Sequence, residues 1–494
     1  MFFQRFYDTK LAQASYMIGC QQTGEAVVVD PNRDVEQYID AAVREGLRVT
    51  HVTETHIHAD FVSGARDLAH RTGATLYLSD EGDADWKYQF PTDEDRAAGL
   101  AAVLVRDGDH FMVGNIRLDV LHTPGHTPEH VSFLVTDTPA AAGPWGILTG
   151  DFVFVGDVGR PDLLERAAGH AGTMEAGAHT LFHSLERFRA LPDHLQVWPG
   201  HGAGSACGKA LGAVASTTVG YEKLGNWGVG TTDEDEFVRM VLEGQPEPPR
   251  YFAQMKRINK EGPRILGGLP RPARLPATRI EALLDGGATI VDTRPAAEFA
   301  QGHVPGTINI PLGASFTTWA GWLLPYDRDV HLLVDDDGCS HCLETAVRDL
   351  AMIGLDRVAG IFGTYALDAW TAAGRTLATV AQATPAEVSA MLERGTATVI
   401  DVRGRSEWEA GHLPGVPNIP AGYLAERMGE LSADRPVVVH CQSGARSAIA
   451  ASVLEAHGRT DVVNMVGGFA AWQQAGLPVA RGEESPAMVE AAIA

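Results

Sequence analysis

Three short segments hold residue types that suit metal binding. The segment THIHADF contains His56, His58 and Asp60, the segment HTPGHT contains His126, and the segment TGD ends at Asp151. Each segment belongs to a part of the chain rich in β-branched residues. A neutral imidazole donates a nitrogen lone pair to a metal, and an aspartate supplies negative charge. We therefore predict that His56, His126 and Asp151 bind a metal ion.

The alternative is that these histidines merely satisfy local hydrogen bonds, since the chain has 19 of them. The order of the segments argues against this alternative, because a further segment, PGHG, comes later in the chain with His201. Two more residues lie near the presumed site in sequence. Arg160 offers a planar cation that suits a substrate carboxylate, but an internal ion pair with Asp157 or Asp162 explains it equally well. Cys207 is either a buried structural cysteine or a residue that contacts the substrate.

A second reactive group lies near the other end of the chain. Cys441 follows an apolar strand and precedes a helical run, so its thiol faces a helix N-terminus that stabilises thiolate and persulfide anions. Arg446 adds positive charge, and Gly444 permits the tight turn. We predict that Cys441 carries sulfur, with Ser443, Gly444 and Arg446 as candidate substrate-binding residues.

The elements that position these groups indicate several domains. A chain of 494 residues is too long for one core and predicts about three domains. Residues 26–30 and 48–53 are predicted strands, and residues 35–46 form a predicted amphipathic helix. The second strand runs directly into the His56 loop. This pattern suits a β-sandwich with helices outside it, in which loops build the site.

An internal repeat comes after the first domain. Asp292-Thr293-Arg294 and the segment GHVPG at 302–306 match Asp401-Val402-Arg403 and GHLPG at 411–415. Short β-branched runs alternate with helical runs in each copy, as in a parallel sheet covered by helices. The predicted domains are 1–245, a proline-rich linker at 246–276, two copies of one α/β domain at 277–376 and 384–482, and a tail at 483–494.

The two copies differ at the reactive cysteine. Aligning them without gaps places Asp337 opposite Cys441, so the first copy has no thiol at that position and is predicted to be an inactive spacer or docking surface. The first copy does contain Cys339 and Cys342. This CxxC resembles a redox or metal pair, but without a second pair the signal is weak.

The bulk composition excludes several classes of partner. A formal net charge of −24 argues against nucleic acid and anionic membranes, and no apolar run approaches the ~20 residues that span a bilayer. The N-terminus lacks the pattern of a secretory signal. Five cysteines in so long a chain are not a disulfide framework. We expect a cytoplasmic protein with reduced thiols.

The metal-binding segments resemble the metallo-β-lactamase fold, whose signature is H-x-H-x-D-H with distant His, Asp and His after it. Phe61 stands where the last histidine of that signature, a ligand of a second metal, is expected. The segments THIHADFVSG, HTPGHT and TGDFVFVGDVGRPDL resemble the persulfide dioxygenase branch of this fold. That resemblance implies one Fe(II) per chain, held by His56, His126 and Asp151, with open positions for a thiolate and O2. It places His58, Asp60 and His201 around the ligands, where they orient them or the substrate.

The CQSGARS loop resembles the active loop of rhodanese sulfurtransferases, and the whole order resembles bacterial fusions of a persulfide dioxygenase with an inactive and an active rhodanese domain. The fold implied is an αββα sandwich followed by two α/β domains with parallel sheets. The activity implied is the oxidation of a low-molecular-weight thiol persulfide by O2 to sulfite, coupled to sulfur transfer that gives thiosulfate. Such fusions are often dimers or tetramers, so we expect a homo-oligomer. The sequence does not identify the carrier thiol. Two alternatives stay open: a zinc thioester hydrolase of the glyoxalase II type with appended rhodanese modules, and rhodanese repeats that bind without turnover.

Overall fold

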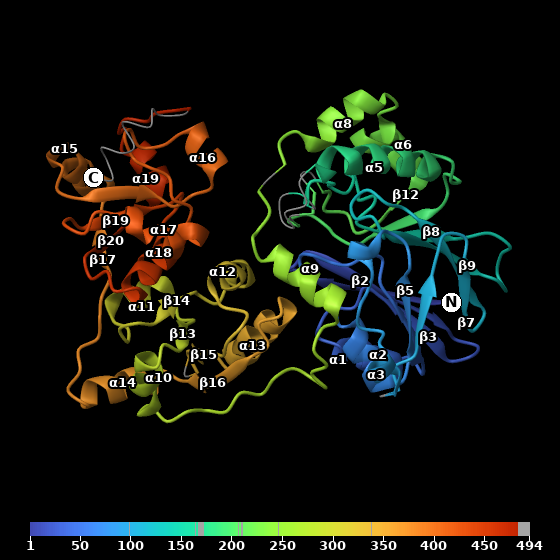
Figure 1. Cartoon of the computed structure of the whole chain (residues 1–494), viewed down its shortest axis with the longest axis horizontal. Helices are drawn as coiled ribbons and strands as arrows, with labels where there is room; N and C mark the ends of the chain where they lie inside the picture. Colours follow the sequence, from blue (N-terminus) through green and yellow to red (C-terminus); the bar gives the residue numbers. More distant parts are fainter. Residues whose placement is uncertain are drawn as a thin grey trace. The chain divides into compact units, whose positions relative to one another are not determined.

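The computed structural model of the chain forms two compact units (Figure 1). It describes residues 1–97, 99–163, 165, 172–205, 207–208, 211–245, 247–336 and 338–482. Unit 1 comprises Met1–Pro270 with Leu350–Gly354, and unit 2 comprises Arg271–Asp349 with Leu355–Ala494. Asp337 and the predicted tail at 483–494 lie outside the described residues.

Unit 1 contains two six-stranded sheets, and both are mixed. In order across the first sheet, the strands are β1 (Phe2–Asp8), β2 (Gln13–Cys20), β3 (Glu25–Val29), β4 (Arg48–Thr53), β5 (Thr75–Ser79) and β6 (Ala102–Val105). Across the second sheet they are β12 (Thr217–Thr218), β11 (Gln196–Pro199), β10 (Gly146–Gly150), β9 (Val131–Asp137), β8 (Ile116–His122) and β7 (His110–Val113).

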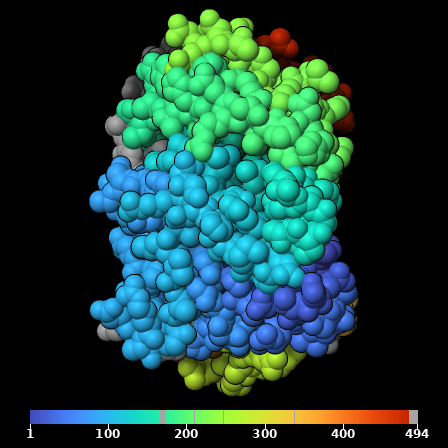
Figure 2. Space-filling model, turned by 90° about the vertical axis from the view of Figure 1, so that its right-hand side faces the viewer, coloured from blue at the N-terminus to red at the C-terminus, as the bar shows by residue number. Residues whose placement is uncertain are grey.

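Helices cover the outer faces of this sandwich. The helices of unit 1 are α1 (Glu36–Arg44), α2 (Ala65–Thr72), η1 (Ala84–Trp86), α3 (Asp93–Ala97), α5 (Thr173–Arg189), α6 (Val219–Gly225), α7 (Trp227–Gly230), α8 (Glu234–Leu242) and α9 (Phe252–Glu261). One apolar cluster joins the two sheets through residues such as Val27 and Phe133. A second packs α1 and α2 on the first sheet, and a third packs α5 and α8 on the second. In Figure 2 the green surface formed around α5, α6 and α8 adjoins the blue and cyan surface of the N-terminal half. The predicted αββα sandwich is confirmed.

Each predicted metal-binding residue of unit 1 lies in a loop that follows a strand. β4 precedes His56, β8 precedes His126, β10 precedes Asp151 and β11 precedes His201. β10 and β11 are parallel neighbours, so their carboxyl ends bring Asp151 and His201 to the same edge of the sheet.

Unit 2 contains two four-stranded parallel sheets. In order across the sheets, the strands are β14 (Ile308–Asn309), β13 (Thr289–Asp292), β15 (Val330–Leu333) and β16 (Val358–Phe362), and then β17 (Ala381–Ala383), β20 (Val462–Met465), β19 (Val437–His440) and β18 (Thr398–Asp401). The helices are α10 (Arg279–Asp285), α11 (Ala296–Gln301), α12 (Phe316–Leu323), α13 (Cys342–Met352), α14 (Tyr365–Ala372), α15 (Pro385–Arg394), α16 (Arg405–Ala410), η2 (Ala421–Tyr423), α17 (Leu424–Arg427), η3 (Met428–Glu430), α18 (Ala445–Ala456) and α19 (Gly468–Gln474). Two parallel-sheet α/β domains were predicted, and both are present.

The motif shared by the two copies is a buried polar scaffold. In the second copy Arg403 forms a bidentate pair with Asp401 and donates to the carbonyl of Gly411. In the first copy Arg294 pairs with Asp292 and donates to the carbonyl of Gly302 in the same way. Both copies contain this network, so the repeated motif has a structural role in the fold. The two copies differ in the loop that follows the matching strand, β15 in the first copy and β19 in the second.

Candidate functional site

The donor atoms of His56, His126 and Asp151 converge in unit 1, within 4.8 Å of one another. Asp151 Oδ2 lies 3.9 Å from His56 Nε2 and 3.5 Å from His126 Nε2. All three side chains are buried, yet His56 Nε2 and Asp151 Oδ2 have no hydrogen-bond partner. A buried polar atom without a partner costs free energy, and a bound metal removes that cost. The three residues therefore fit a metal ion.

Hydrogen bonds fix the orientation of both imidazoles. His56 Nδ1 lies 2.9 Å from Thr55 Oγ1, whose hydroxyl donates to Asp30 Oδ2 at 2.9 Å. His126 Nδ1 donates to the carbonyl of Arg160 at 3.1 Å. In both rings the occupied Nδ1 leaves the Nε2 lone pair for the metal.

The charge states also suit a metal ion. Burial lowers the pKa of His56 well below its ordinary value, and it lowers the pKa of His126, so both rings are neutral donors. Burial opposes ionisation of Asp151, but His201, whose Nδ1 lies 2.7 Å from Asp151 Oδ1, holds the pKa of this carboxyl well below its usual range. Asp151 is thus an anion.

His58 lies beside the three ligands but faces Asp30. Its Nε2 is 3.2 Å from Asp30 Oδ1. Burial alone would lower the pKa of His58, but Asp30, together with Glu54 and Asp60, raises it to about 9. A protonated imidazole has no lone pair for a metal, so the contact with Asp30 favours the predicted supporting role of His58.

Asp60, His201 and Cys207 form a second cluster of potential ligands. Asp60 Oδ2 lies 2.7 Å from His201 Nε2. Burial raises the pKa of the Cys207 thiol well above its ordinary value, and the carboxylates of Asp60 and Asp151 raise it further. Phe61 is fully buried, and its ring centroid is 4.4 Å from that of His58. The position at which the sequence predicts a further metal-binding histidine thus presents an apolar ring beside His58.

Arg160 is held by an internal partner. Its side chain is fully buried and forms a bidentate ion pair with Asp162, at 2.8 and 2.7 Å. Of the two interpretations of Arg160, the structure shows the internal pair. The backbone carbonyl of the same residue orients His126.

Three supporting residues were missed by the sequence analysis. Asp30 accepts hydrogen bonds from the backbone and the hydroxyl of Thr55 and adopts a left-handed backbone with φ 51°. His130 Nε2 accepts from the backbone N–H of Asp151 at 3.1 Å, and Glu129 Oε1 accepts from the backbone N–H of Ile57 at 2.7 Å. Glu129 and His130 lie in the HTPGHTPEHV segment, and their position near His126 in the sequence is the feature that could have identified them.

The second copy in unit 2 holds the predicted thiol site. Cys441 is buried, and its Sγ accepts hydrogen bonds from the backbone N–H of Gly444 at 3.2 Å and from Ser447 Oγ at 3.6 Å. Gly444 has φ 101°, so the turn requires glycine there. Arg446 forms a bidentate pair with Glu407, at 2.5 and 2.8 Å, and is therefore held in place beside the loop.

A cavity of about 400 Å³ adjoins this loop. Ser443 and Gly444 line it on one side, and α11 of the first copy lines it on the other with Ala296, Ala300 and Gln301. The first copy thus supplies one wall of the space next to the Cys441 loop.

The strand register corrects the alignment of the two copies. Asp292 pairs with Leu333 in the first copy, and Asp401 pairs with His440 in the second. The structural counterpart of Cys441 is therefore Val334, one residue after Leu333. The gapless alignment with Asp337 was wrong because the loop after β15 is longer than the loop after β19. The first copy still has no thiol at this position, since Val334 is a buried apolar residue.

The expectation of reduced thiols is wrong for one pair. Cys339 and Cys342 form a disulfide in the first copy, whereas Cys20, Cys207 and Cys441 are free. In the described residues, no helix is long and apolar enough to cross a membrane.

Comparison with known families matches residues 8–201 to the metallo-beta-lactamase superfamily and residues 276–363 and 384–475 to the rhodanese-like domain. Persulfide dioxygenase ETHE1, mitochondrial, of Bos taurus is 27% identical over 203 residues, which are 40% of this chain and 67% of that protein. Hydroxyacylglutathione hydrolase of Rhodospirillum rubrum is 29% identical over 186 residues, which are 38% of this chain and 60% of that protein. The chain spans about 60% of the length of several curated relatives that it matches.

A solved structure covers more of the chain. The crystal structure of a metallo-beta-lactamase from Staphylococcus aureus subsp. aureus COL is 44% identical, with a TM-score of 0.63, and the match covers 73% of this chain and 98% of that one. The chain therefore belongs to the metallo-beta-lactamase superfamily and carries two rhodanese-like domains after its metal-binding domain.

Proposed function

We propose that the chain is an iron-dependent persulfide dioxygenase joined to a sulfurtransferase. The substrate is the persulfide of a low-molecular-weight thiol, RSSH. The first reaction is RSSH + O2 + H2O → RSH + H2SO3, which the metal-binding domain performs. The second transfers a sulfane sulfur to the resulting sulfite and gives thiosulfate.

The observation that carries the first reaction is the ligand set of one metal. His56, His126 and Asp151 provide two imidazoles and one carboxylate. The sequence has Phe61 where the resembling two-metal sites have a further histidine. Two histidines and one carboxylate are the ligand set of non-haem Fe(II) oxygenases, which leave positions open for substrate and O2. Similarity to the bovine persulfide dioxygenase supports the same assignment.

The chain's own residues prepare this site. His56 Nε2, His126 Nε2 and Asp151 Oδ2 would hold Fe(II), which would supply open coordination positions for a thiolate and O2. His201 bridges Asp151 and Asp60, so it keeps the ligand carboxylate ionised and in one orientation. Burial of all three ligands excludes bulk water from their donor atoms.

Cys441 performs the second reaction in two balanced steps. Its thiolate attacks the terminal sulfur of RSSH, which forms a Cys441 persulfide and releases RSH. Sulfite then attacks that terminal sulfur, which releases thiosulfate and restores the thiol. Gly444 and Ser447 donate hydrogen bonds to the Cys441 sulfur, and such donors stabilise the anions that form in both steps.

The second candidate function is a zinc thioester hydrolase. The cluster of Asp60, His201 and Cys207 favours it, because these residues offer donors for a second metal. Similarity to the hydroxyacylglutathione hydrolase also points this way. In this alternative two metals activate water and no O2 is consumed.

Metal analysis and O2 uptake separate the two functions. We expect anaerobically purified protein to contain one iron per chain and to consume O2 with glutathione persulfide. His126→Ala and Asp151→Ala should lose both the iron and the O2 uptake, because two remaining ligands hold Fe(II) weakly. Two zinc ions per chain, with hydrolysis of a glutathione thioester, would establish the hydrolase instead. Retained iron with normal O2 uptake in either variant would remove that residue from the ligand set.

A further inference from the structure

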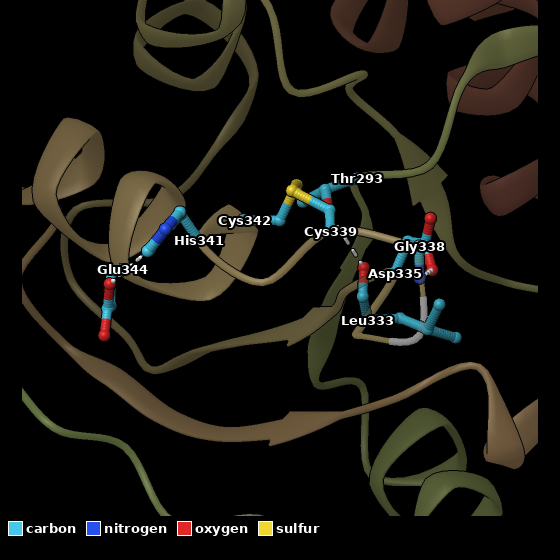
Figure 3. Close-up of a disulfide and its surroundings, with 8 residues drawn as sticks. All are labelled: Thr293, Leu333, Asp335, Gly338, Cys339, His341, Cys342 and Glu344. Carbon is cyan, nitrogen blue, oxygen red and sulfur yellow. Dashed lines mark hydrogen bonds and ion pairs between the residues drawn. A yellow bond between two sulfur atoms is a disulfide. The ribbon is translucent and has the colours of Figure 1, made fainter.

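The disulfide of the first rhodanese-like copy lies in the loop that leads from β15 into α13 (Figure 3). The corresponding loop of the second copy, from β19 into α18, carries Cys441. Val334 replaces the reactive cysteine at the end of β15, but the longer loop then brings Cys339 and Cys342 to the start of the next helix. The loop that has no counterpart of Cys441 thus carries a cysteine pair of its own.

The surroundings of this pair suit thiol chemistry in three respects. Cys339 and Cys342 are both partly exposed, whereas Cys20, Cys207 and Cys441 are buried. Cys342 is the first residue of α13, an 11-residue helix. Backbone N–H groups in the first turn of a helix stabilise a thiolate, so the sulfur of Cys342 is the better leaving group of the two.

Among the described residues of this loop and helix start, Asp335, Asp336 and Glu344 have other partners. Asp335 Oδ1 accepts a hydrogen bond from the backbone N–H of Gly338 at 2.8 Å. Glu344 faces His341 (Figure 3), with 3.3 Å between Glu344 Oε2 and His341 Nδ1. Asp336 forms an ion pair with Arg274. The positive charge of Arg274 offsets part of the repulsion between Asp336 and a thiolate.

We propose that Cys339 and Cys342 are a thiol–disulfide exchange site whose substrate is a low-molecular-weight thiol or its disulfide. The thiolate RS⁻ attacks the sulfur of Cys339, which forms a Cys339–SR mixed disulfide and releases the thiolate of Cys342. A second RS⁻ attacks the sulfur of the bound R group, which releases RSSR and the thiolate of Cys339. The net reaction is disulfide + 2 RSH → dithiol + RSSR. It runs in reverse when RSSR is in excess.

This activity is independent of the metal site and of Cys441, so its test does not depend on the proposed function. The alternative role of the pair is a permanent crosslink that only closes the longer loop. An exchange site requires that small thiols reach the two sulfurs and that the protein is folded in both the oxidised and the reduced state. A permanent crosslink requires neither.

The test is a redox titration of the full-length wild-type protein in buffers of graded glutathione to oxidised glutathione ratio. After an acid quench, free thiols are alkylated and each cysteine is quantified by peptide mass spectrometry. We expect Cys339 and Cys342 to become labelled together, in one reversible two-electron transition within the glutathione range. A pair that stays oxidised in excess glutathione would show a permanent crosslink. A pair that stays reduced in excess oxidised glutathione would exclude a disulfide. Either result would overturn the proposal.

Single variants test the assignment of the two sulfurs. Cys339→Ser and Cys342→Ser should each form a mixed disulfide with oxidised glutathione, and the remaining Cys342 should react several-fold faster than the remaining Cys339, because it begins α13. Cys20→Ser is the matched control, since Cys20 is buried in unit 1 and its loss should leave the transition of the pair unchanged. Thermal melting of each variant identifies any that fail to fold, and the wild-type titration decides the proposal without them. Absence of any glutathione adduct in two folded single variants would also overturn it.

Discussion

Replacing Asp30 by Asn should weaken iron binding, although Asp30 is not a ligand. The Asp30 carboxylate accepts the Thr55 hydroxyl proton, so the Thr55 oxygen is free to accept the Nδ1 proton of His56. This order of donors leaves His56 Nε2 deprotonated for the metal. An asparagine that keeps its oxygen toward the Thr55 backbone N–H turns its NH2 group toward the Thr55 hydroxyl. The hydroxyl proton then points to His56 Nδ1 and favours the tautomer with a proton on Nε2, which cannot bind a metal.

The expected loss of stability follows from the three hydrogen bonds that Asp30 accepts, two from Thr55 and one from His58. Loss of one bond to a charged group costs about 1.5–3 kcal/mol of stability. Disturbing the partner of a metal-binding histidine lowers metal affinity by roughly 10–100-fold. We expect both effects, measured by urea unfolding of the metal-free protein and by competition of Fe(II) with a chelator.

Two variants control this experiment. Asp292→Asn removes a similarly buried carboxylate from the first rhodanese-like copy, so it should lower stability and leave iron affinity unchanged. Thr55→Val removes the hydroxyl relay and should lower iron affinity while preserving the contact between His58 and Asp30. Wild-type iron affinity in both Asp30→Asn and Thr55→Val would refute the reasoning.

Two further predictions concern the same site. Phe61→His should leave O2 uptake dependent on iron, and metal analysis will show whether the new imidazole recreates a second site; tight binding of two metals by the wild type would contradict the single-metal assignment. The pKa of His58 is raised to about 9 in the folded protein, so its stabilisation is complete below its unfolded pKa of about 6.5 and is lost as the pH rises through 9. Urea unfolding of the metal-free wild type should therefore show stability falling across this window, and Asp30→Asn should flatten the fall; an equal fall in both proteins would exclude the Asp30 contact as its cause.

The sequence predicted the layers of both units, and it identified the three residues whose donor atoms converge in unit 1, because strand ends and short motifs encode these features locally. Asp30 was missed, since its left-handed backbone and its contact with His58 depend on how β3 and β4 pair. The alignment with Asp337 failed for a related reason. A gapless comparison assumes equal loops, and only the pairing of Asp292 with Leu333 reveals that Val334 occupies the position of the cysteine.

Side-chain partners were the other feature that sequence left open. The segment around Arg160 was equally consistent with a substrate clamp and an internal pair, and only burial against Asp162 distinguishes the two. The disulfide of Cys339 and Cys342 was underestimated because a CxxC has many structural contexts. Its context here, the start of a helix in a rhodanese-like loop, is visible only in three dimensions.

The central claim is that persulfide is oxidised at one iron and that Cys441 then transfers sulfur to the product. The most direct measurement is O2 uptake with glutathione persulfide, with sulfite and thiosulfate quantified in the same samples for the wild type and for Cys441→Ser. The wild type should release mainly thiosulfate, with one O2 consumed per thiosulfate. Cys441→Ser should consume O2 at a near-normal rate and release sulfite instead. Loss of persulfide without O2 uptake, or thiosulfate formation by Cys441→Ser at the wild-type rate, would contradict the account.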